Sequence, residues 1–192
     1  MTLRVPKAEL PPELAATMIE RFGAVAEPVE VMWHNPQVAR AGLAFGGTVG
    51  EWDAVDESLK SFAHMAVAAQ VGCSWCLDIG YFQVNNQRLD VLKASQVPCW
   101  RESDLFTPLE RDVLEYAEAM TTTPPAVTDE LSARLLDRMG PAALVELTAF
   151  IAFCNLSTRS NVALGIESQG FSATCEVPLA ARPRPRPGRV PA

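Results

Sequence analysis

The residues best suited to chemistry are two cysteines in the stretch Gly72–Asp78, which reads GCSWCLD. On a helix, positions i and i+3 lie on one face, so the sulfurs of Cys73 and Cys76 can point the same way. One helical turn also brings their Cα atoms to about 5 Å, a separation that a disulfide accepts. The spacing therefore indicates reversible thiol–disulfide chemistry. Half of a metal site, or two buried cysteines without chemistry, are the alternatives.

The other cysteines do not extend this motif. The chain has five cysteines and begins MTLRVPK, without the apolar core of a signal peptide. We therefore expect a cytoplasmic protein in a reducing compartment, with no framework of structural disulfides. Cys99, Cys154 and Cys175 are scattered, and we interpret them as small hydrophobic residues. Because a zinc site usually needs four ligands, one such cysteine pair and two distant histidines predict no metal, and we expect no other cofactor.

The length and charge of the chain restrict the classes of protein to which it can belong. A chain of 192 residues, 48% of them hydrophobic, forms one domain or at most two small ones, and no run of about 18 uncharged apolar residues predicts a membrane span. The tail 181–192 carries four arginines and no acid, so we expect it to be disordered beyond a domain at 1–180. The rest has 12 basic and 23 acidic residues, and this acidity argues against nucleic-acid binding.

Local signals predict an all-α fold, since no alternating strand pattern occurs. The clearest signal is Thr107-Pro108-Leu109-Glu110, a capping box that opens a helix. Asn35 should cap a helix from Pro36 to Phe45, which Gly46-Gly47 would end. Three further helices are expected: one near the N-terminus that begins at Pro12, one from Thr128 to Gly140, and one that begins at Pro141. The last has a wide apolar surface, which suggests burial or a subunit interface.

The cysteine pair lies between two predicted helices. Asp53 or Asp56 should cap a helix that runs to Gln70, and Gly72 should break it. A second helix should begin at Cys73 and end at Asn85-Asn86, with the thiols near its N-terminus on the inward face. A short helix from Leu89 to Ser95, ended by Val97-Pro98, follows.

Four segments together resemble the carboxymuconolactone decarboxylase and AhpD-like alkylhydroperoxidase superfamily. They are Val71–Asp78, Leu105–Met120, Leu144–Asn155 and Asn161–Phe171, and the resemblance spans roughly Glu13 to Ser172. It implies an all-helical bundle that forms homo-oligomers, commonly trimers or hexamers.

The resemblance also implies an activity and the roles of the two thiols. In peroxidase members the second cysteine attacks the hydroperoxide and the first resolves the product. Cys76 would then be the peroxidatic thiol and Cys73 the resolving one, passing through a sulfenic acid to a disulfide that a dithiol partner reduces.

This chain departs from the family's proton relay. Ser61 stands where the family has a glutamate, and Gly80 stands where it has a histidine. Glu57, one turn before Ser61, and His64, three residues after it, are the candidates to replace them. A helix N-terminus alone also lowers the pKa of a cysteine.

Three functions follow from these residues. The first is a thiol-dependent hydroperoxide reductase or disulfide oxidoreductase using Cys73 and Cys76. The second is a non-catalytic helical oligomer that has lost the relay and binds a small molecule near Trp75 and Tyr81. The third is a lactone decarboxylase-like enzyme, ranked last because those enzymes do not rely on such a cysteine pair.

Overall fold

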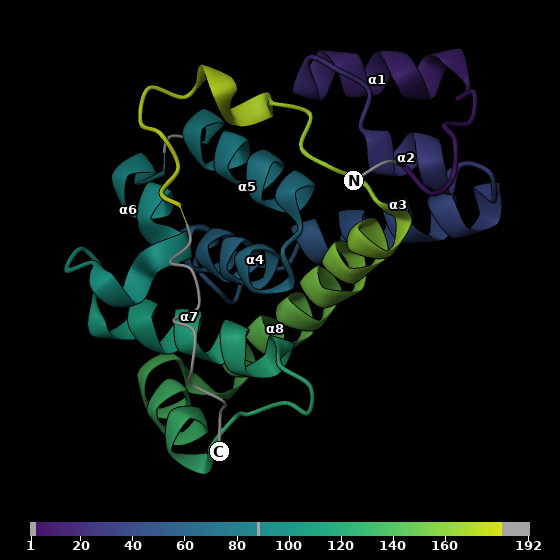
Figure 1. Cartoon of the computed structure of the whole chain (residues 1–192). Coiled ribbons are helices and arrows are strands. Elements are labelled where there is room, and N and C mark those ends of the chain that lie inside the picture. The colour runs from purple at the N-terminus through teal and green to yellow at the C-terminus, as the bar shows by residue number, and fades with distance from the viewer. Residues whose placement is uncertain (1–2, 88, 182–192) are drawn as a thin grey trace.

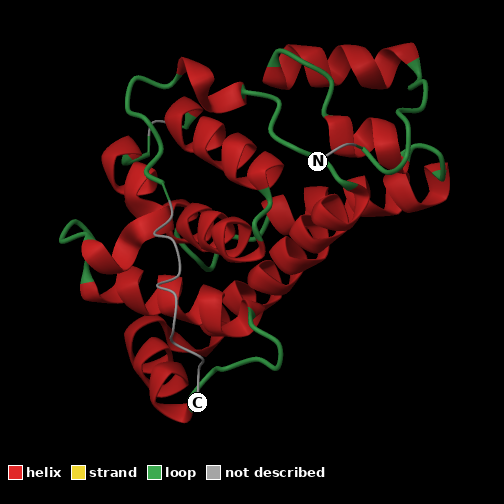
Figure 2. Cartoon of the chain, in the orientation of Figure 1, coloured by secondary structure: helices red, strands yellow, loops and turns green. Residues whose placement is uncertain are grey.

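The regular structure consists of helices throughout residues 3–87 and 89–181, the part of the chain that the computed structural model describes (Figures 1 and 2). No strand occurs within these residues, so the all-α prediction is confirmed. The arginine-rich segment 182–192, expected to be disordered, lies outside the described residues. The elements in chain order are α1 (Pro12–Phe22), α2 (Glu27–Met32), α3 (Pro36–Gly50), α4 (Glu57–Val71), α5 (Ser74–Asn86), α6 (Val91–Gln96), the 3₁₀ helix η1 (Val97–Glu102), α7 (Pro108–Thr121), α8 (Asp129–Leu164) and the 3₁₀ helix η2 (Phe171–Thr174).

Side-chain caps define where several helices begin. The Thr107 hydroxyl accepts from the Glu110 backbone N–H, and the Glu110 carboxylate accepts from the Thr107 N–H at 2.7 Å, so the predicted capping box is confirmed. Asp56 caps α4, which settles the choice between Asp53 and Asp56. These caps satisfy N–H groups that the first turn of a helix leaves without partners.

One of two predicted helix ends is wrong. Helix α3 does not end at Phe45 but continues through Gly46-Gly47 to Gly50. The Phe45 ring meets Phe153 of α8 edge-on, with centroids 5.3 Å apart, and this packing outweighs the low helix propensity of the glycines. Helix α6 ends at Gln96, directly before Val97-Pro98, as predicted. The 3₁₀ helix η1 follows it without a gap, and Pro98 is tolerated in its first turn.

Helix α8 contains the predicted break. Gly140 has φ 78° and ψ 170°, a non-helical conformation that glycine adopts without strain, and Pro141 follows it. The chain therefore changes direction at Gly140, as the sequence indicated. The long segment after Pro141 runs diagonally from α7 to α3 (Figure 1).

Helix α4 lies at the centre of the main core and packs against α5, α7 and α8 (Figure 1). Its fully buried side chains include Phe62, Met65 and Val67, which meet Leu114 of α7 and Leu147 of α8 in one hydrophobic cluster. Burying each such side chain contributes roughly 1.5–3 kcal/mol. The core therefore fixes α4 and α5, the two helices that flank the cysteine pair.

One face of α8 is apolar without being buried. By length and hydropathy alone this helix is apolar enough to cross a membrane. Its buried stripe, which includes Leu147 and Ile151, packs in the main core, whereas Val145 and Leu156 remain 69% and 59% exposed. The full burial expected for this helix is therefore found on one side only.

Candidate active site

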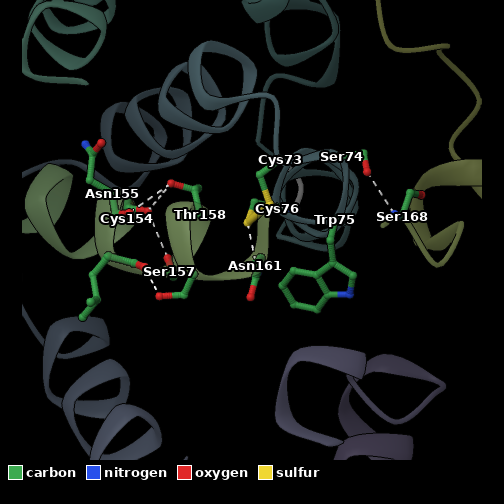
Figure 3. The surroundings of a disulfide bond; sticks show 12 residues. Cys73, Ser74, Trp75, Cys76, Cys154, Asn155, Ser157, Thr158, Asn161 and Ser168 are labelled. Carbon is green, nitrogen blue, oxygen red and sulfur yellow. Dashed lines mark hydrogen bonds between the residues drawn. A yellow bond between two sulfur atoms is a disulfide. The ribbon is translucent and has the colours of Figure 1, made fainter. Parts of the chain in front are cut away.

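The two sulfurs of the cysteine pair form a disulfide at the start of α5 (Figure 3). Gly72 ends α4 in a left-handed conformation, and Cys73 then serves as the N-cap of α5, with Cys76 in its first turn. The Cα atoms of Cys73 and Cys76 are 5.4 Å apart, close to the separation expected from one helical turn. The first requirement of reversible thiol–disulfide chemistry, bonding distance between the sulfurs, is met.

Each sulfur accepts one N–H hydrogen bond. The backbone N–H of Cys76 donates to Cys73 Sγ at 3.2 Å, and the side-chain amide of Asn161 donates from α8 to Cys76 Sγ at 3.3 Å (Figure 3). Such donors, together with the positive end of the α5 dipole, stabilise a thiolate over a thiol. Asn161 belongs to a segment used for the family resemblance, but nothing in the sequence indicates that its side chain faces Cys76.

The disulfide is almost completely removed from solvent. Cys73 and Cys76 are 1% and 2% exposed, and Ala68, Leu77 and Val162 pack against them. A bulky reactant cannot reach either sulfur in this arrangement. Reaction therefore requires a small reactant or a local displacement of the covering side chains.

His64 lies directly against Gly80, one helical turn beyond Cys76. A Cβ added to Gly80 would lie 3.0 Å from His64 Nδ1 and 3.3 Å from Met65 Cγ, closer than such contacts normally are. The imidazole of His64 thus occupies, from α4, the space that a side chain at position 80 would need. An imidazole stands beside position 80 even though the residue there is glycine.

Desolvation controls the charge of His64. It lowers the pKa of this imidazole from 6.5 to about 4, because the surrounding protein disfavours the charged form. The ring is therefore neutral at pH 7 and a weaker proton acceptor than a free imidazole, and it does not stabilise a thiolate through a positive charge.

Glu57 does not join this group. It lies seven residues before His64, about 10 Å along α4, and its carboxylate is 54% exposed and pairs with Lys60 at 3.1 Å. Ser61, also on α4, is partly buried. Of the two residues predicted to replace the relay, the fold brings His64 beside the pair's helix and leaves Glu57 at the other end of α4.

Asp78 anchors the C-terminal segment to α5. One of its oxygens accepts from Ser168 Oγ and from the backbone N–H groups of Gly170 and Phe171, and the other accepts from the backbone and hydroxyl of Ser172, all at 2.6–3.0 Å. Burial alone would raise the pKa of Asp78, but these bonds outweigh it and hold the pKa below its ordinary value. Asp78 is thus a structural carboxylate, directed toward the 168–172 turn.

The residues between the cysteines hold the same segment. Ser74 Oγ accepts from the Ser168 N–H at 3.1 Å (Figure 3), and Trp75 Nε1 donates to the Gln169 side chain at 2.8 Å. Gln169 also bonds the backbone at Val25 and Glu27, which ties the N-terminal helices to the cysteine motif. The outward side of the motif is therefore occupied by protein.

The remaining cysteines have no disulfide partner among the described residues. Cys154 is buried, and burial raises the pKa of its thiol far above the ordinary value, as expected of a small hydrophobic residue. Cys99 and Cys175 are only partly buried, so that interpretation holds less fully for them. Burial and the nearby Asp78 charge raise the pKa of Cys175.

Comparison with other proteins identifies a relative and the fold. No protein-family model matches the sequence. The uncharacterized protein YnjA of Escherichia coli (strain K12) is 40% identical over 158 residues, which cover 82% of this chain and 85% of YnjA. The AhpD core of a peroxidase-related protein from Ralstonia eutropha JMP134 has the same fold, with a TM-score of 0.78, 20% identity, and coverage of 92% of this chain and 97% of that one. The chain belongs to the same family as YnjA, and its fold is that of AhpD-like proteins.

A second structural neighbour carries a ligand. A cysteine-to-alanine variant of the debrominase Bmp8, in complex with 2,3,4-tribromopyrrole, has a TM-score of 0.79 and 21% identity, covering 91% of this chain and 96% of that one. At this identity the likeness concerns the AhpD-like fold alone. The residues of the present site must be judged from their own geometry.

In this AhpD-like chain a pocket lies at a different place from the small-molecule site that we expected near Trp75 and Tyr81. Tyr81 is fully buried and donates to the Val177 carbonyl at 2.6 Å, while Trp75 packs between two hydrophobic clusters. Tyr81 therefore presents no surface to a small molecule, whereas Trp75 remains partly exposed. A pocket of about 490 Å³ lies instead at the ends of α4, α7 and α8, with Val71 and Val162 in its wall.

Proposed function

We propose that this protein is a thiol-dependent hydroperoxide reductase in which Cys76 attacks the peroxide and Cys73 resolves the product. The observation that carries the proposal is the Cys73–Cys76 disulfide at the N-terminus of α5, with an N–H donor on each sulfur. A pair that can close into a disulfide within one turn requires no large movement between its oxidised and reduced forms.

The proposed cycle has three steps. The Cys76 thiolate attacks one oxygen of ROOH, the O–O bond breaks, and ROH leaves after taking up a proton while Cys76 becomes a sulfenic acid. The Cys73 thiolate then attacks the Cys76 sulfur, the S–O bond breaks, and the hydroxide takes up a proton and leaves as water while the disulfide forms. A dithiol reductant finally attacks this disulfide through a mixed disulfide and restores both thiols.

His64 is proposed to replace the family's relay histidine. Its imidazole stands beside Gly80, one turn from Cys76, and stays uncharged throughout the physiological pH range, so it can accept a hydrogen bond from a reacting group. Asn161 would stabilise the negative charge on Cys76 through its amide. The geometry offers no corresponding support for Glu57.

Turnover of peroxide tests this function. The reduced protein should consume hydrogen peroxide or a small alkyl hydroperoxide in the presence of excess dithiol, and Cys76→Ser should reduce the rate by at least 100-fold. Asn161→Ala should give a smaller loss, about tenfold, since one hydrogen bond to a charged sulfur contributes about 1.5 kcal/mol. If Cys76→Ser consumes peroxide as fast as the wild type, the proposal fails.

The debrominase neighbour suggests a second substrate for the same assay. That protein binds a brominated pyrrole, and a reductive debromination would use the same pair of thiols. Bromide release from 2,3,4-tribromopyrrole, measured beside peroxide consumption, separates the two activities. If the protein shows neither activity while its Cys73–Cys76 dithiol is intact, the non-catalytic, ligand-binding alternative is favoured.

We further propose that the chain assembles into a homo-oligomer through the outer face of α8. Val145, Ala152 and Leu156 lie at positions i, i+7 and i+11 along this helix and are all exposed. This spacing places them on one face, where a second copy can bury them.

A further inference from the structure

A pocket with two arginines lies next to the cysteine pair. It has a volume of about 490 Å³, within the range of roughly 300–1,000 Å³ that is typical of small-molecule sites. Its wall includes Arg4 from the N-terminal segment, Thr121 at the end of α7, Thr123 just after it, and Arg159 of α8. Two guanidinium groups therefore line a space large enough for an organic ligand.

No acid among the described residues neutralises either arginine. Arg4 donates to the carbonyls of Val162 and Ala163, and Arg159 donates to the Thr121 carbonyl and to Asn155. Within residues 3–87 and 89–181, no carboxylate forms an ion pair with Arg4 or Arg159. Carbonyls at helix ends offset only part of two full positive charges, and each guanidinium has five N–H donors, more than these bonds use.

The pocket and the disulfide share a wall. Val162 lines the pocket and also packs against the cluster of Cys73 and Cys76. Asn161, its neighbour in α8, donates to Cys76 Sγ, and Val71, also in the wall, is two residues from Cys73. Displacement of the Val162 side chain would therefore open the buried sulfurs toward the pocket.

We propose that this pocket binds the carboxylate of the small molecule that reacts with the Cys73–Cys76 pair, through Arg4 and Arg159. The inference rests on the proposed function and adds a substrate class to it, an organic acid. The acid is either the hydroperoxide or the thiol that reduces the disulfide. In the second case the thiolate of one acid molecule attacks one sulfur of the disulfide, and the other cysteine leaves as a thiolate. A second thiol then attacks the mixed disulfide and releases the remaining cysteine.

Matched pairs of acids and esters test the proposal. The thiol arm measures reduction of the disulfide by 3-mercaptopropionate and by its methyl ester. The hydroperoxide arm measures oxidation of the reduced pair by a hydroperoxy-octadecadienoic acid and by its methyl ester. The two members of a pair differ only at the carboxyl group, which is charged in the acid and a neutral methyl ester in the other. A change in their rate ratio between variants therefore measures how much the arginines favour the charged group.

Arg4→Gln and Arg159→Gln should each lower the acid-to-ester rate ratio about tenfold in one arm, with ester rates unchanged. Arg4→Lys should retain most of the preference, because the positive charge is kept. Arg138→Gln is the control, since this arginine pairs with Asp112 and does not line the pocket. Thermal unfolding checks each variant, and if Arg159→Gln unfolds, the comparison of Arg4→Gln with Arg4→Lys decides.

The arm in which the ratio falls identifies the acid as the oxidant or the reductant. A ratio that stays within twofold of wild type in both arms overturns the pocket's role. The thiol arm requires only that the disulfide can be reduced, so it gives a result even if the protein consumes no peroxide. Failure of the peroxidase function and failure of the pocket are therefore distinguishable.

Discussion

His64 and Gly80 form one complementary contact, in which the imidazole of one residue fills the space that the absent side chain of the other leaves free. The AhpD-like family has its histidine at the position of Gly80, on the helix of the cysteines. Here an imidazole approaches the same position from α4. Glycine thus replaces the family's histidine at position 80, but another histidine, His64, lies beside that position.

Gly80→Ala tests the functional importance of this contact. The added Cβ would displace His64, so we expect the rate of peroxide consumption to fall about tenfold and stability to fall by about 1 kcal/mol. Gly47→Ala is the matched control, because Gly47 also lies in a helix and has no atom near an added Cβ. That control should be neutral or slightly stabilising. Equal peroxidase rates in the two variants would remove His64 from the mechanism.

The pH dependence of stability provides a second test of His64. Its pKa of about 4 in the folded protein is below the unfolded value near 6.5, so between these values the unfolded chain binds more protons. The contribution of His64 to the free energy of unfolding is therefore at its maximum above about pH 6.5. It decreases as the pH falls toward 4, by about 2 kcal/mol from pH 7 to pH 5.

His64→Gln should lose this part of the dependence, because glutamine does not titrate. Urea unfolding of both proteins at pH 7 and pH 5 gives the difference directly. An identical loss of stability in the two proteins would mean that His64 is not held neutral by its surroundings.

Asp78→Asn should destabilise the protein by about 2–4 kcal/mol and release the 168–172 turn. The amide replaces an acceptor of five hydrogen bonds with a group that is partly a donor, so several N–H and O–H groups lose their partner. Hydrogen exchange of the Phe171 and Ser172 amides measures the release. Asp137→Asn, at an exposed position of α8, should leave both quantities unchanged. Protected amides in Asp78→Asn would show that the turn does not depend on this carboxylate.

Substitution of the apolar face of α8 tests the proposed assembly. Val145→Asp places a charge on the face that a second copy would cover, so we expect dissociation toward a monomer in light scattering after gel filtration. Leu92→Asp, at a similarly exposed position of α6, should keep the wild-type mass. A wild-type protein that is already monomeric would contradict the assembly proposal outright.

The sequence predicted those features that depend on local chemistry. The capping box of Thr107 and Glu110, the break at Gly140 and the single-turn spacing of Cys73 and Cys76 all involve residues within a few positions of one another. The continuation of α3 through Gly46-Gly47 was missed because it depends on packing against Phe153, about a hundred residues away. Local propensity contains no information about such a contact.

The same distinction applies to the site. His64 could be named as a candidate from its position near Ser61, but its contact with Gly80 follows from how α4 packs on α5. Asn161 donates to Cys76 across 85 positions of sequence, and the pocket arginines are 155 positions apart. These relationships become visible only when the helices are placed in space.

The central claim is that Cys76 is the thiol that attacks peroxide and Cys73 the one that resolves it. Its most direct test is a single turnover of the reduced Cys73→Ser variant with one equivalent of hydroperoxide, followed by a sulfenic acid-specific probe and peptide mapping. The account predicts a sulfenic acid on Cys76, formed much faster than on a free cysteine, whereas wild-type protein gives the Cys73–Cys76 disulfide. Unmodified Cys76 in the variant, with both thiols still reduced in the wild type, would contradict it.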